Sequence, residues 1–513
     1  MRLPKTATLS TGPGGLGNRR LLTVAAALAI VLGLAFRIVI YLSSLGRLGI
    51  DEATWGLMAR RATHGHISAF FWGQSYGGTQ EVVAVAALFA VAGTHLVLMR
   101  VVPIAFSVAA ALVLRNVVRR TSGEPAGIVA ALLVWIWPIF AVWKMEIWSG
   151  FYGAALLYVS LILLLTLLLA EEPTNARIAL MGLLLGLSLW ESVQTLAIVI
   201  PALAWLTVRR PRVWLRGWLA LPGLVLGGLP WLLSNLRHDW WSLSFQGSGG
   251  TYESRFHGFV SATMPMALGL RVPYLIDWTL SSVVSVLLYA AAAAALVVAA
   301  WRWRRSELSL LPCLIVAFPF LYAINGMTSS TLEPRYVVVL LPVVIAAIAT
   351  AATSVPRAGI ILTVAALLSV VGLVRWVDWN NAPARADAYN DQVVGLGPTI
   401  AALDRAHVDR AYATYAIAYR LTFDTRERIV VSEADLTDLA AVAPGRVLPP
   451  VPTNYTEHHH PAYDRAVRAA HRFAYIFVRR EPYEAHDVAL LTAHGYRREN
   501  IATVIVLYSP PQP

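Results

Sequence analysis

The chain has 513 residues, of which 57% are hydrophobic and only 14% carry a charge, and its mean hydropathy is +0.61. This composition excludes an ordinary soluble protein and predicts a polytopic α-helical membrane protein, while the single cysteine excludes an intrachain disulfide framework. The formal net charge of +12 does not indicate a nucleic-acid partner, because the basic residues gather in short clusters between apolar segments, as orientation signals do.

Residues 1–20 form a short basic N-terminal tail, and an apolar segment, 21–43, follows. With a rise of about 1.5 Å per residue, this segment is long enough to cross a hydrocarbon core of about 30 Å. It lacks the short apolar core and the cleavage site of a signal peptide. Ten further segments bring the expected number of transmembrane helices to about eleven: 99–118, 126–143, 151–170, 177–194, 195–208, 218–236, 279–300, 308–324, 336–354 and 358–376.

Arginine clusters fall in alternate loops, which predicts the side of the membrane on which each loop lies. The clusters are Arg19–Arg20, Arg115 with Arg119–Arg120, Arg209–Arg210 with Arg212 and Arg216, Arg302 with Arg304–Arg305, and Arg357. These loops and the N-terminus are expected to be cytoplasmic. The outer side of the cell membrane then holds 44–98, 144–150, 237–277, 325–335 and the C-terminal region.

The apolar segment 81–98 interrupts this alternation, since a full span there would reverse the side of every later loop. We therefore expect an interfacial or re-entrant helix lying against the bilayer. A short span is the alternative, because periodicity alone does not separate the two.

A separate soluble domain, 380–513, is expected to follow the membrane domain, 21–379, because charged residues become frequent and no later segment is long enough to span. Helical and strand-like segments alternate in it, which predicts a small α/β layer domain. The helical segments are 393–403, 416–421, 463–470 and 486–494, and the strand-like segments are 411–414, 428–431, 473–478 and 502–508. It contains no glycine-rich phosphate loop, so no nucleotide site is expected.

Two adjacent acidic residues, Asp51 and Glu52, come just after the first apolar segment. Ionisable groups at the edge of a membrane are costly, which favours a functional role. A carboxylate there can accept the proton of an acceptor hydroxyl within about 3 Å. The structural alternative is a helix N-cap followed by an acid in the first turn.

The same outer segment contains His66, Trp72, Gln74 and Tyr76 among several glycines. Aromatic side chains can stack on sugar rings, and glycines let the backbone approach a ligand closely. An interfacial aromatic belt with turn glycines is the alternative interpretation.

Charged residues also occur at the outer ends of later helices. Lys144 is placed to meet an anionic headgroup, and Glu146 to pair with Lys144 or to orient a substrate. The alternative is an interfacial Lys–Glu pair within a tryptophan girdle. Glu191 and Gln194 lie near an expected outer turn, where cap and loop roles are favoured over function.

A further cluster, Glu333-Pro334-Arg335-Tyr336, precedes a late apolar segment. The planar fork of an arginine suits phosphate oxygens, and its stem can lie along lipid. The alternative is a snorkelling Arg335 beside Tyr336 in an aromatic belt. The run His458-His459-His460 has the residue type of metal ligands, but consecutive side chains rarely point together and no acidic cluster follows, so no metal site is predicted.

Together these clusters resemble the GT-C-class membrane glycosyltransferases that use polyprenyl-phosphate sugars, of the protein O-mannosyltransferase and lipid A aminoarabinose transferase type. The resemblance covers most of 20–376 and rests on the order and sidedness of the motifs. Similar to bacterial members are Asp51-Glu52-Ala53, Gly73-Gln74-Ser75-Tyr76-Gly77-Gly78, and Arg335-Tyr336 followed by Leu341-Pro342. The segment 415–421 is also similar to a stretch in some bacterial members, with either acceptor recognition or capping of the pocket as its role.

The resemblance implies an inverting transferase that moves a hexose or pentose from a polyprenyl-phosphate donor to a glycan, lipid or protein acceptor outside the cytoplasmic membrane. It implies that Asp51 is the general base and that Glu52 supports it. It further implies that Arg335, with Lys144, holds the carrier phosphate, whose charge grows as the sugar leaves, and that 72–78 line the pocket. Some members use a divalent cation, which leaves metal association of the acidic pair as an alternative to the metal-free site predicted here.

Two rival functions stay open from the sequence. A lipid or solute transporter also carries intramembrane charges, but such proteins often have internal repeats, and none is convincing here. A binding or assembly protein without catalytic activity could share the scaffold, although the presence of both Asp51 and Arg335 argues against it.

Overall fold

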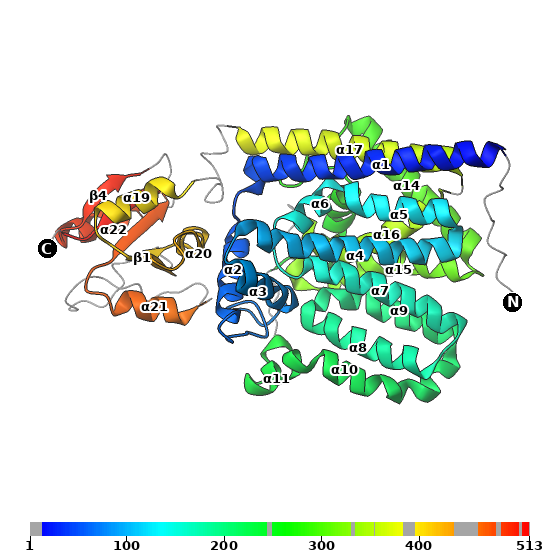
Figure 1. Cartoon of the computed structure of the whole chain (residues 1–513), viewed down its shortest axis with the longest axis horizontal. Coiled ribbons are helices and arrows are strands. Elements are labelled where there is room, and N and C mark those ends of the chain that lie inside the picture. The colour runs from blue at the N-terminus through cyan, green and yellow to red at the C-terminus, as the bar shows by residue number, and fades with distance from the viewer. Residues whose placement is uncertain are drawn as a thin grey trace.

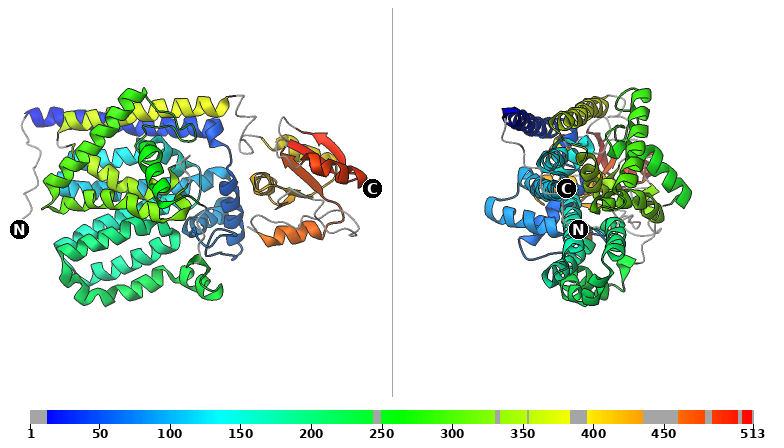
Figure 2. Two further views of the ribbon diagram at one scale, coloured as in Figure 1. Left: turned by 180° about the vertical axis from the view of Figure 1, so that it is seen from behind. Right: turned by 90° about the vertical axis from the view of Figure 1, so that its right-hand side faces the viewer.

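The computed structural model describes residues 13–243, 249–329, 334–352, 354–382, 395–434, 460–478, 484–501 and 505–511. Most helices of the membrane domain run side by side along the long axis of the molecule, and a smaller domain that contains the strands lies beyond one end of this bundle (Figure 1). The views from behind and along the axis give the same arrangement (Figure 2). The predicted fold class, a polytopic helical membrane protein followed by a small α/β domain, is confirmed.

All eleven segments predicted to span the membrane are helical in the structure. Six helices within the described ranges are long and apolar enough to cross a membrane: α1 (Pro13–Leu42), α4 (Leu96–Ser122), α7 (Tyr152–Glu171), α14 (Ser282–Trp303), α15 (Leu310–Ile324) with the preceding η6 (Glu307–Ser309), and α17 (Val355–Asn381). Two bent pairs raise the number to eight: α5 (Glu124–Ile136) with α6 (Ile139–Glu146), bent by 64°, and η3 (Pro211–Ala220) and α10 (Leu221–Gly227) with α11 (Leu229–Arg237), bent by 67°.

The number of spans therefore differs from the expected eleven. The three remaining predicted spans correspond to helices that are shorter than a full span: α8 (Asn175–Glu191), α9 (Leu196–Arg209) and α16 (Leu341–Ala349). Polar residues bound α8 and α9: Thr174 precedes α8, Ser192, Gln194 and Thr195 lie between the two helices, and Arg209–Arg210 end α9. The count of eleven consequently stands only if these short helices cross the bilayer too.

The first outer segment forms two short helices, α2 (Ile50–Ala62) and α3 (Gln80–Ala92), which lie at the end of the bundle that faces the α/β domain (Figure 1). At about 1.5 Å per residue, α3 is only about 20 Å long, too short for a normal span. It ends at Gly93, whose φ of 78° breaks the helix before α4 begins at Leu96. The expected single element over 81–98 is thus divided between α3 and the first turn of α4.

Shorter elements connect the long helices. They are η1 (Ser44–Gly46), η2 (Val193–Thr195), η4 (Trp241–Leu243), α12 (Tyr252–Gly258), η5 (Phe259–Thr263), α13 (Met264–Ala267), η7 (Gly326–Ser329) and η8 (Arg335–Leu340).

Glycines allow α8 and α10 to pack backbone against backbone. A Cβ added at Gly182 would lie 1.9 Å from the carbonyl oxygen of Ala220, and one at Gly227 would lie 2.4 Å from that of Leu183. The spacing is Gly-x-x-x-Gly on both helices, at Gly182 and Gly186 and at Gly223 and Gly227. In lipid there is little hydrophobic drive between helices, so close van der Waals packing of this kind stabilises their association.

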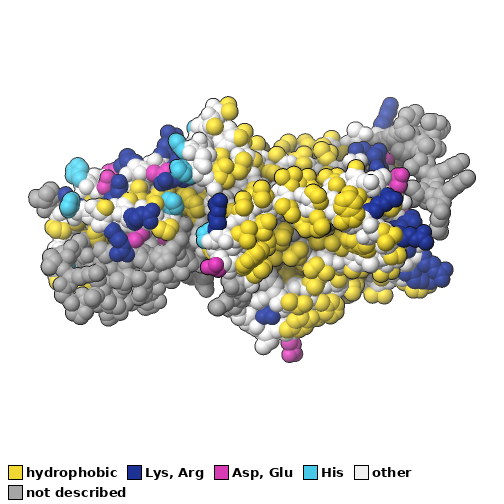
Figure 3. Space-filling view, turned by 90° about the horizontal axis from the view of Figure 1, so that it is seen from below, with side chains coloured by type: hydrophobic (Ala, Val, Ile, Leu, Met, Phe, Trp, Pro, Cys, Tyr) yellow, Lys and Arg dark blue, Asp and Glu magenta, His cyan; other side chains and the backbone are white. Residues whose placement is uncertain are grey.

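The outer surface of the bundle is largely apolar, and most of the Lys and Arg side chains on the face drawn in Figure 3 lie at one end. Figure 3 shows hydrophobic side chains over much of this face, with Lys and Arg side chains at the end of the bundle farthest from the α/β domain. The sequence predicts this end to be cytoplasmic. The orientation of the two termini stays a prediction.

The α/β domain contains α19 (Gly397–Arg405), β1 (Arg410–Ala413), α20 (Tyr415–Asp424), β2 (Val430–Glu433), α21 (Pro461–Arg468), β3 (Ala474–Val478), α22 (Glu484–Ala493), β4 (Arg497–Asn500) and β5 (Ile505–Ser509). The sheet order is β2-β1-β3-β5-β4. Strand β1 pairs in parallel with β2 and β3, with Ala411 opposite Val431 and Ala474, and the β3–β5 and β5–β4 pairs are antiparallel. Strand β4 was not predicted because its sequence, RREN, is a charged edge strand without an apolar face.

Candidate functional site

Asp51 lies in the first turn of α2, at the end of the membrane domain that faces the α/β domain. Gly49 is the N-cap of this helix, and its N–H donates to Glu52 Oε2 at 3.3 Å, which is the acidic half of a capping box. The Asp51 side chain is exposed. Its position in the first turn also places the negative charge at the favourable end of the helix dipole.

Glu52 points in the opposite direction, into the helical bundle. Its side chain is only 2% exposed and accepts from Arg100 Nε at 2.8 Å and from Arg100 Nη2 at 2.9 Å. The N–H of Trp148 donates to it as well, at 3.2 Å. These contacts tie α2 to α4 and to the loop after α6, so Glu52 fixes the helix that presents Asp51.

Sequence reasoning missed Arg100, although a signal was present. Arg100 interrupts the apolar segment 99–118, and a charge inside such a segment needs a partner. Besides Glu52, its Nη2 donates to the carbonyl of Gly46 at 2.9 Å. Arg100 therefore joins η1 and the start of α2 to the N-terminal part of α4.

The α/β domain provides a hydrogen bond to Asp51. The hydroxyl of Tyr415, the first residue of α20, donates to Asp51 Oδ1 at 3.0 Å and lies 3.5 Å from Thr54 Oγ1. Burial and the neighbouring Asp51 charge raise the pKa of the Tyr415 phenol well above its ordinary value. The phenol consequently remains protonated and acts as a donor at neutral pH.

Helix α20 packs along α2 with the same direction. Near the middle of α2, Gly56 leaves room for the ring of Phe423, since a Cβ there would lie 2.5 Å from Phe423 Cε2. The guanidinium of Arg60 lies 4.9 Å from the centre of the same ring. The ring therefore packs against both Gly56 and Arg60 on α2.

An ion-pair cluster closes the other end of this contact. Glu427 accepts from Arg61 at 3.0 Å, lies 3.6 Å from Arg60, and accepts from the hydroxyl of Tyr463 at 2.8 Å. Burial alone would raise the pKa of the Glu427 carboxyl, but the Tyr463 hydrogen bond and the two arginines outweigh it and lower that pKa. The carboxylate is charged at neutral pH, as the ion pairs require.

Trp72 packs against two rings of the α/β domain. Its ring stacks on the imidazole of His460, with centroids 4.0 Å apart and planes inclined by 15°, and Tyr463 meets it edge-on. Burial, with the nearby charge of Arg61, lowers the pKa of His460 to about 4, which keeps this imidazole neutral. His458 and His459 lie outside the described residues.

The other predicted residues of the first outer segment have different surroundings. His66 is exposed, whereas Gln74 and Tyr76 are half-buried in a turn. This turn is closed by a hydrogen bond from the N–H of Phe71 to the carbonyl of Gly77 at 2.9 Å. The φ values of 73° at Gly73 and 81° at Gly77 favour glycine. The N–H of Gly78 donates to the carbonyl of Glu191 at 2.9 Å, which anchors this turn on the end of α8.

Lys144 and Glu146 are both buried. The Lys144 ammonium lies 5.0 Å from the ring centre of Tyr152 and 5.2 Å from that of Trp143, in cation–π contacts. Glu146 interacts electrostatically with Arg37 on α1 and with Arg100 on α4. Both residues are therefore covered by protein rather than presented at the membrane surface.

Arg335 and Tyr336 begin η8, with the guanidinium 5.3 Å from the tyrosine ring centre. Both side chains are half-buried. Element η8 contacts η2. Element η2 begins two residues after Glu191, whose carbonyl accepts from Gly78 of the first outer segment. Arg335 thus lies on the same end of the bundle as that segment, and Glu333 lies outside the described residues.

Two buried acids, Glu81 and Glu191, lie near this turn. No role was predicted for Glu81 from the sequence, and a cap or loop role was favoured for Glu191. Glu81 accepts from the N–H of Ala154 at 2.8 Å, but within the described residues its Oε2 and both carboxylate oxygens of Glu191 have no hydrogen-bond partner. The two carboxylates interact electrostatically. Their oxygens are acceptors suited to a cation or to a shared proton, although no group of three or more His, Cys, Asp or Glu in the described ranges is placed to hold a metal ion.

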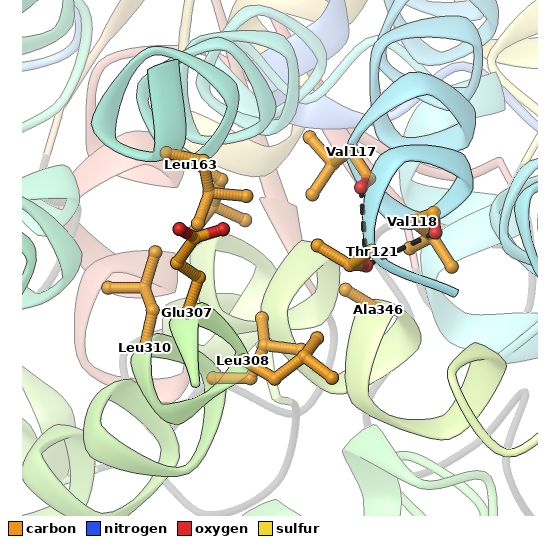
Figure 4. Close-up of a pocket in the computed structure, with 10 residues that line it drawn as sticks. Val117, Val118, Thr121, Leu163, Glu307, Leu308, Leu310 and Ala346 are labelled. Atoms are coloured by element: carbon orange, nitrogen blue, oxygen red, sulfur yellow. Dashed lines mark hydrogen bonds between the residues drawn. The ribbon is translucent and has the colours of Figure 1, made fainter. Parts of the chain in front are cut away.

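A small hollow lies at the other end of the bundle and is not part of this site. Figure 4 shows it between α4, α7, α15 and α16, lined mainly by aliphatic side chains with Thr121 and Glu307. The Thr121 hydroxyl is within hydrogen-bond distance of the carbonyls of Val117 and Val118. Since Thr121 is near the C-terminal end of α4 and Arg100 near its start, the length of this helix separates the hollow from Asp51.

Comparison with known proteins finds similarity in the fold and not in the sequence. No protein-family model matches the chain, and no curated protein sequence matches it. The structure is similar to the crystal structure of ArnT from Cupriavidus metallidurans in the apo state, with a TM-score of 0.59 and 15% identity over 97% of this chain and 100% of that one. For ArnT bound to undecaprenyl phosphate the TM-score is 0.56, with 14% identity over 96% and 99% of the two chains. The chain therefore has an ArnT-like fold.

Proposed function

We propose that this protein is a membrane glycosyltransferase that moves a sugar from a polyprenyl-phosphate donor to an acceptor on the outer face of the cell membrane. The observation that carries the proposal is the exposed Asp51 carboxylate, held at a capped helix N-terminus by the buried Glu52–Arg100 pair. The ArnT-like fold supports the reaction class, and the undecaprenyl phosphate bound to ArnT supports the class of donor.

In the proposed reaction, Asp51 accepts the proton of the acceptor nucleophile as that atom attacks the anomeric carbon of the donor sugar. The bond between the anomeric carbon and the phosphate oxygen breaks, and its electron pair leaves with the polyprenyl phosphate. One displacement inverts the configuration of the anomeric carbon. Glu52 takes no part in the proton transfer, because its oxygens bind Arg100 and two backbone N–H groups.

Arg335 is the proposed partner of the carrier phosphate, whose negative charge increases in the transition state. A guanidinium binds phosphate oxygens through paired N–H groups. Lys144 acts from a buried position, so its contribution is electrostatic rather than a direct surface contact. The acceptor is a glycan, a lipid or a protein, and the sugar is a hexose or a pentose.

Native mass spectrometry of the detergent-purified protein with added undecaprenyl phosphate tests carrier binding. We expect the wild type to retain the lipid and Arg335→Ala to lose it. Arg357→Ala is the matched control, because this exposed arginine lies at the start of α17, on the side predicted to be cytoplasmic. Equal retention by Arg335→Ala and wild type would contradict the proposed phosphate contact.

Transfer itself is tested with a set of undecaprenyl-phosphate hexoses and pentoses, by following release of undecaprenyl phosphate. Asp51→Asn keeps the shape of the side chain but cannot accept the proton, so release should fall by about 100-fold or more. Asp409→Asn, an exposed acid of the α/β domain, is the control. No release by the wild type with any donor would move the assignment to a transporter.

A further inference from the structure

We infer that the α/β domain completes the reaction site, and that Tyr415 is a positioning residue that holds the Asp51 carboxylate in one orientation. The inference rests on the proposed function, in which Asp51 is the base. It assigns a role to a part of the chain that lies 364 residues away in the sequence and belongs to a different domain.

The first step is the geometry at Asp51. Tyr415 donates to Oδ1 at 3.0 Å, and within the described residues no other side chain forms a hydrogen bond with this carboxylate. Oδ2 is therefore the oxygen that can receive the acceptor proton. A carboxylate on the exposed surface of a helix otherwise rotates among several rotamers, and a single strong donor selects one of them.

The second step is the way in which the hydroxyl is placed. Helices α2 and α20 lie side by side and parallel, so the N-terminal Tyr415 meets the N-terminal Asp51, while Glu427, which follows α20, meets Arg60 and Arg61 at the end of α2. Phe423 fills the space over Gly56 between these two ends. The contact is fixed at both ends and in the middle, which determines the register of one helix against the other.

The third step is the support that Tyr415 itself receives. Its ring meets that of Tyr419, one turn later in α20, edge-on, with centroids 5.4 Å apart. Thr54 Oγ1, 3.5 Å from the Tyr415 hydroxyl, donates to the carbonyl of Ile50 in the same helix as Asp51. The hydroxyl is thus held between two residues of the first turns of α2 and is not free to turn away.

The position of the sheet agrees with this role. Strand β1 ends at Ala413, and Tyr415 begins α20 two residues later. The carboxyl end of a parallel strand followed by a helix is where α/β domains usually present ligand-binding residues. Here that end faces Asp51, so an acceptor that reaches the base contacts the α/β domain as well.

The test uses the full-length protein in lipid nanodiscs and the pair of variants Tyr415→Phe and Tyr419→Phe. Each variant loses one hydroxyl and keeps its ring, but the Tyr419 hydroxyl interacts with Glu433 rather than with Asp51. With the undecaprenyl-phosphate sugar that serves as donor, we expect Tyr415→Phe to lower kcat by about tenfold or more, since a hydrogen bond to a charged group is lost. KM for the donor should change less than about twofold, and Tyr419→Phe should keep kcat within about twofold.

A second measurement does not depend on turnover. In hydrogen exchange followed by mass spectrometry, the peptide that begins α2 should exchange faster in Tyr415→Phe than in the wild type, and at the wild-type rate in Tyr419→Phe. Absence of turnover in the wild type would contradict the proposed function while this exchange result still supports the contact. Any of three results would overturn the positioning role: a wild-type kcat in Tyr415→Phe, an equal decrease of kcat in both variants, or a change in KM without a change in kcat.

Discussion

The α8–α10 contact in the bundle and the α2–α20 contact between the domains join helices by opposite means. The first brings backbones together through Gly182, Gly186, Gly223 and Gly227 and uses no charge. The second uses Glu427 with Arg60 and Arg61, the Tyr415–Asp51 hydrogen bond and one packed phenylalanine. Lipid provides little hydrophobic driving force for helix association, so close van der Waals packing of the backbones stabilises the first contact. A contact that faces water can also use side chains whose charge changes with pH.

This difference predicts that docking of the α/β domain depends on pH, whereas packing inside the bundle does not. Glu52 belongs to the bundle through its buried pair with Arg100. Tyr415 belongs to the docked α/β domain. The predictions below separate the two by their effects on stability and on docking.

The largest expected effect comes from Arg100→Met, which leaves the buried Glu52 carboxylate without its charged partner. Removing one member of a buried ion pair typically costs about 3–5 kcal/mol. We expect the variant to have a much lower unfolding temperature in detergent, and the double variant Glu52→Gln with Arg100→Met to recover part of the loss. A wild-type unfolding temperature in Arg100→Met would show that the pair does not hold α2.

Gly182→Leu should have the next largest effect, because even a Cβ at this position lies 1.9 Å from the carbonyl oxygen of Ala220. Overpacking of this kind costs about 1–3 kcal/mol or more, as the helices must separate. Thermal unfolding in detergent measures it. The control is Gly359→Leu in α17, where a Cβ would meet nothing within 4 Å, and similar unfolding temperatures for the two variants would refute backbone packing of α8 on α10.

Much of the fold was readable from the sequence, because hydrophobic run length and alternating arginine clusters act locally. All eleven apolar segments are helical, and six of the eight predicted segments of the α/β domain lie wholly in the described residues and overlap observed elements. The described parts of the other two, 393–403 and 502–508, contain residues of α19 and β5. The charged edge strand β4 has no apolar pattern to identify it. Three predicted spans, 177–194, 195–208 and 336–354, form helices shorter than a full span, so the expected number of eleven depends on whether these helices cross the bilayer.

The site was readable only in part. Asp51 and Trp72 were predicted as site residues from residue type and position, and both contact the α/β domain in the structure. The partners of the acidic pair were not predicted, since Arg100 is 48 residues from Glu52 and Tyr415 is 364 residues from Asp51. Residue type shows that a buried charge needs a partner, but the path of the chain decides which residue supplies it, and it also turns Glu52 away from Asp51.

Acidic pH should weaken docking of the α/β domain through His460. Its pKa is about 4 in the docked state, below the ordinary value of 6.5, so the undocked state binds more protons in this interval. The stabilisation is therefore complete above about pH 6.5 and is lost progressively as the pH falls toward 4. Hydrogen exchange of the α20 amides between pH 7 and 5 should show faster opening at the lower pH.

His460→Phe keeps a ring to stack on Trp72 and cannot titrate, so its α20 exchange should depend less on pH than that of the wild type, once the intrinsic exchange rates are corrected. His471→Phe, at an exposed position, is the matched control and should behave like the wild type. Identical pH dependence in wild type and His460→Phe would assign the effect to other groups of the interface.

The smallest expected effect, and the one that separates a structural acid pair from a cation site, comes from Glu191→Gln. Both Glu191 oxygens lack a hydrogen-bond partner within the described residues, and the buried Glu81 carboxylate interacts with them. A buried acid beside a second acid is favoured in its protonated form, so the neutral amide of the same shape changes little, and we expect the free energy of unfolding to change by no more than about 1 kcal/mol. Glu172→Gln, an exposed acid at the end of α7, should leave the unfolding temperature unchanged. If Glu191→Gln instead lost transfer activity, and added Mn²⁺ or Mg²⁺ raised the unfolding temperature of the wild type but not of the variant, the two carboxylates would be cation ligands and the metal-free mechanism would have to be revised.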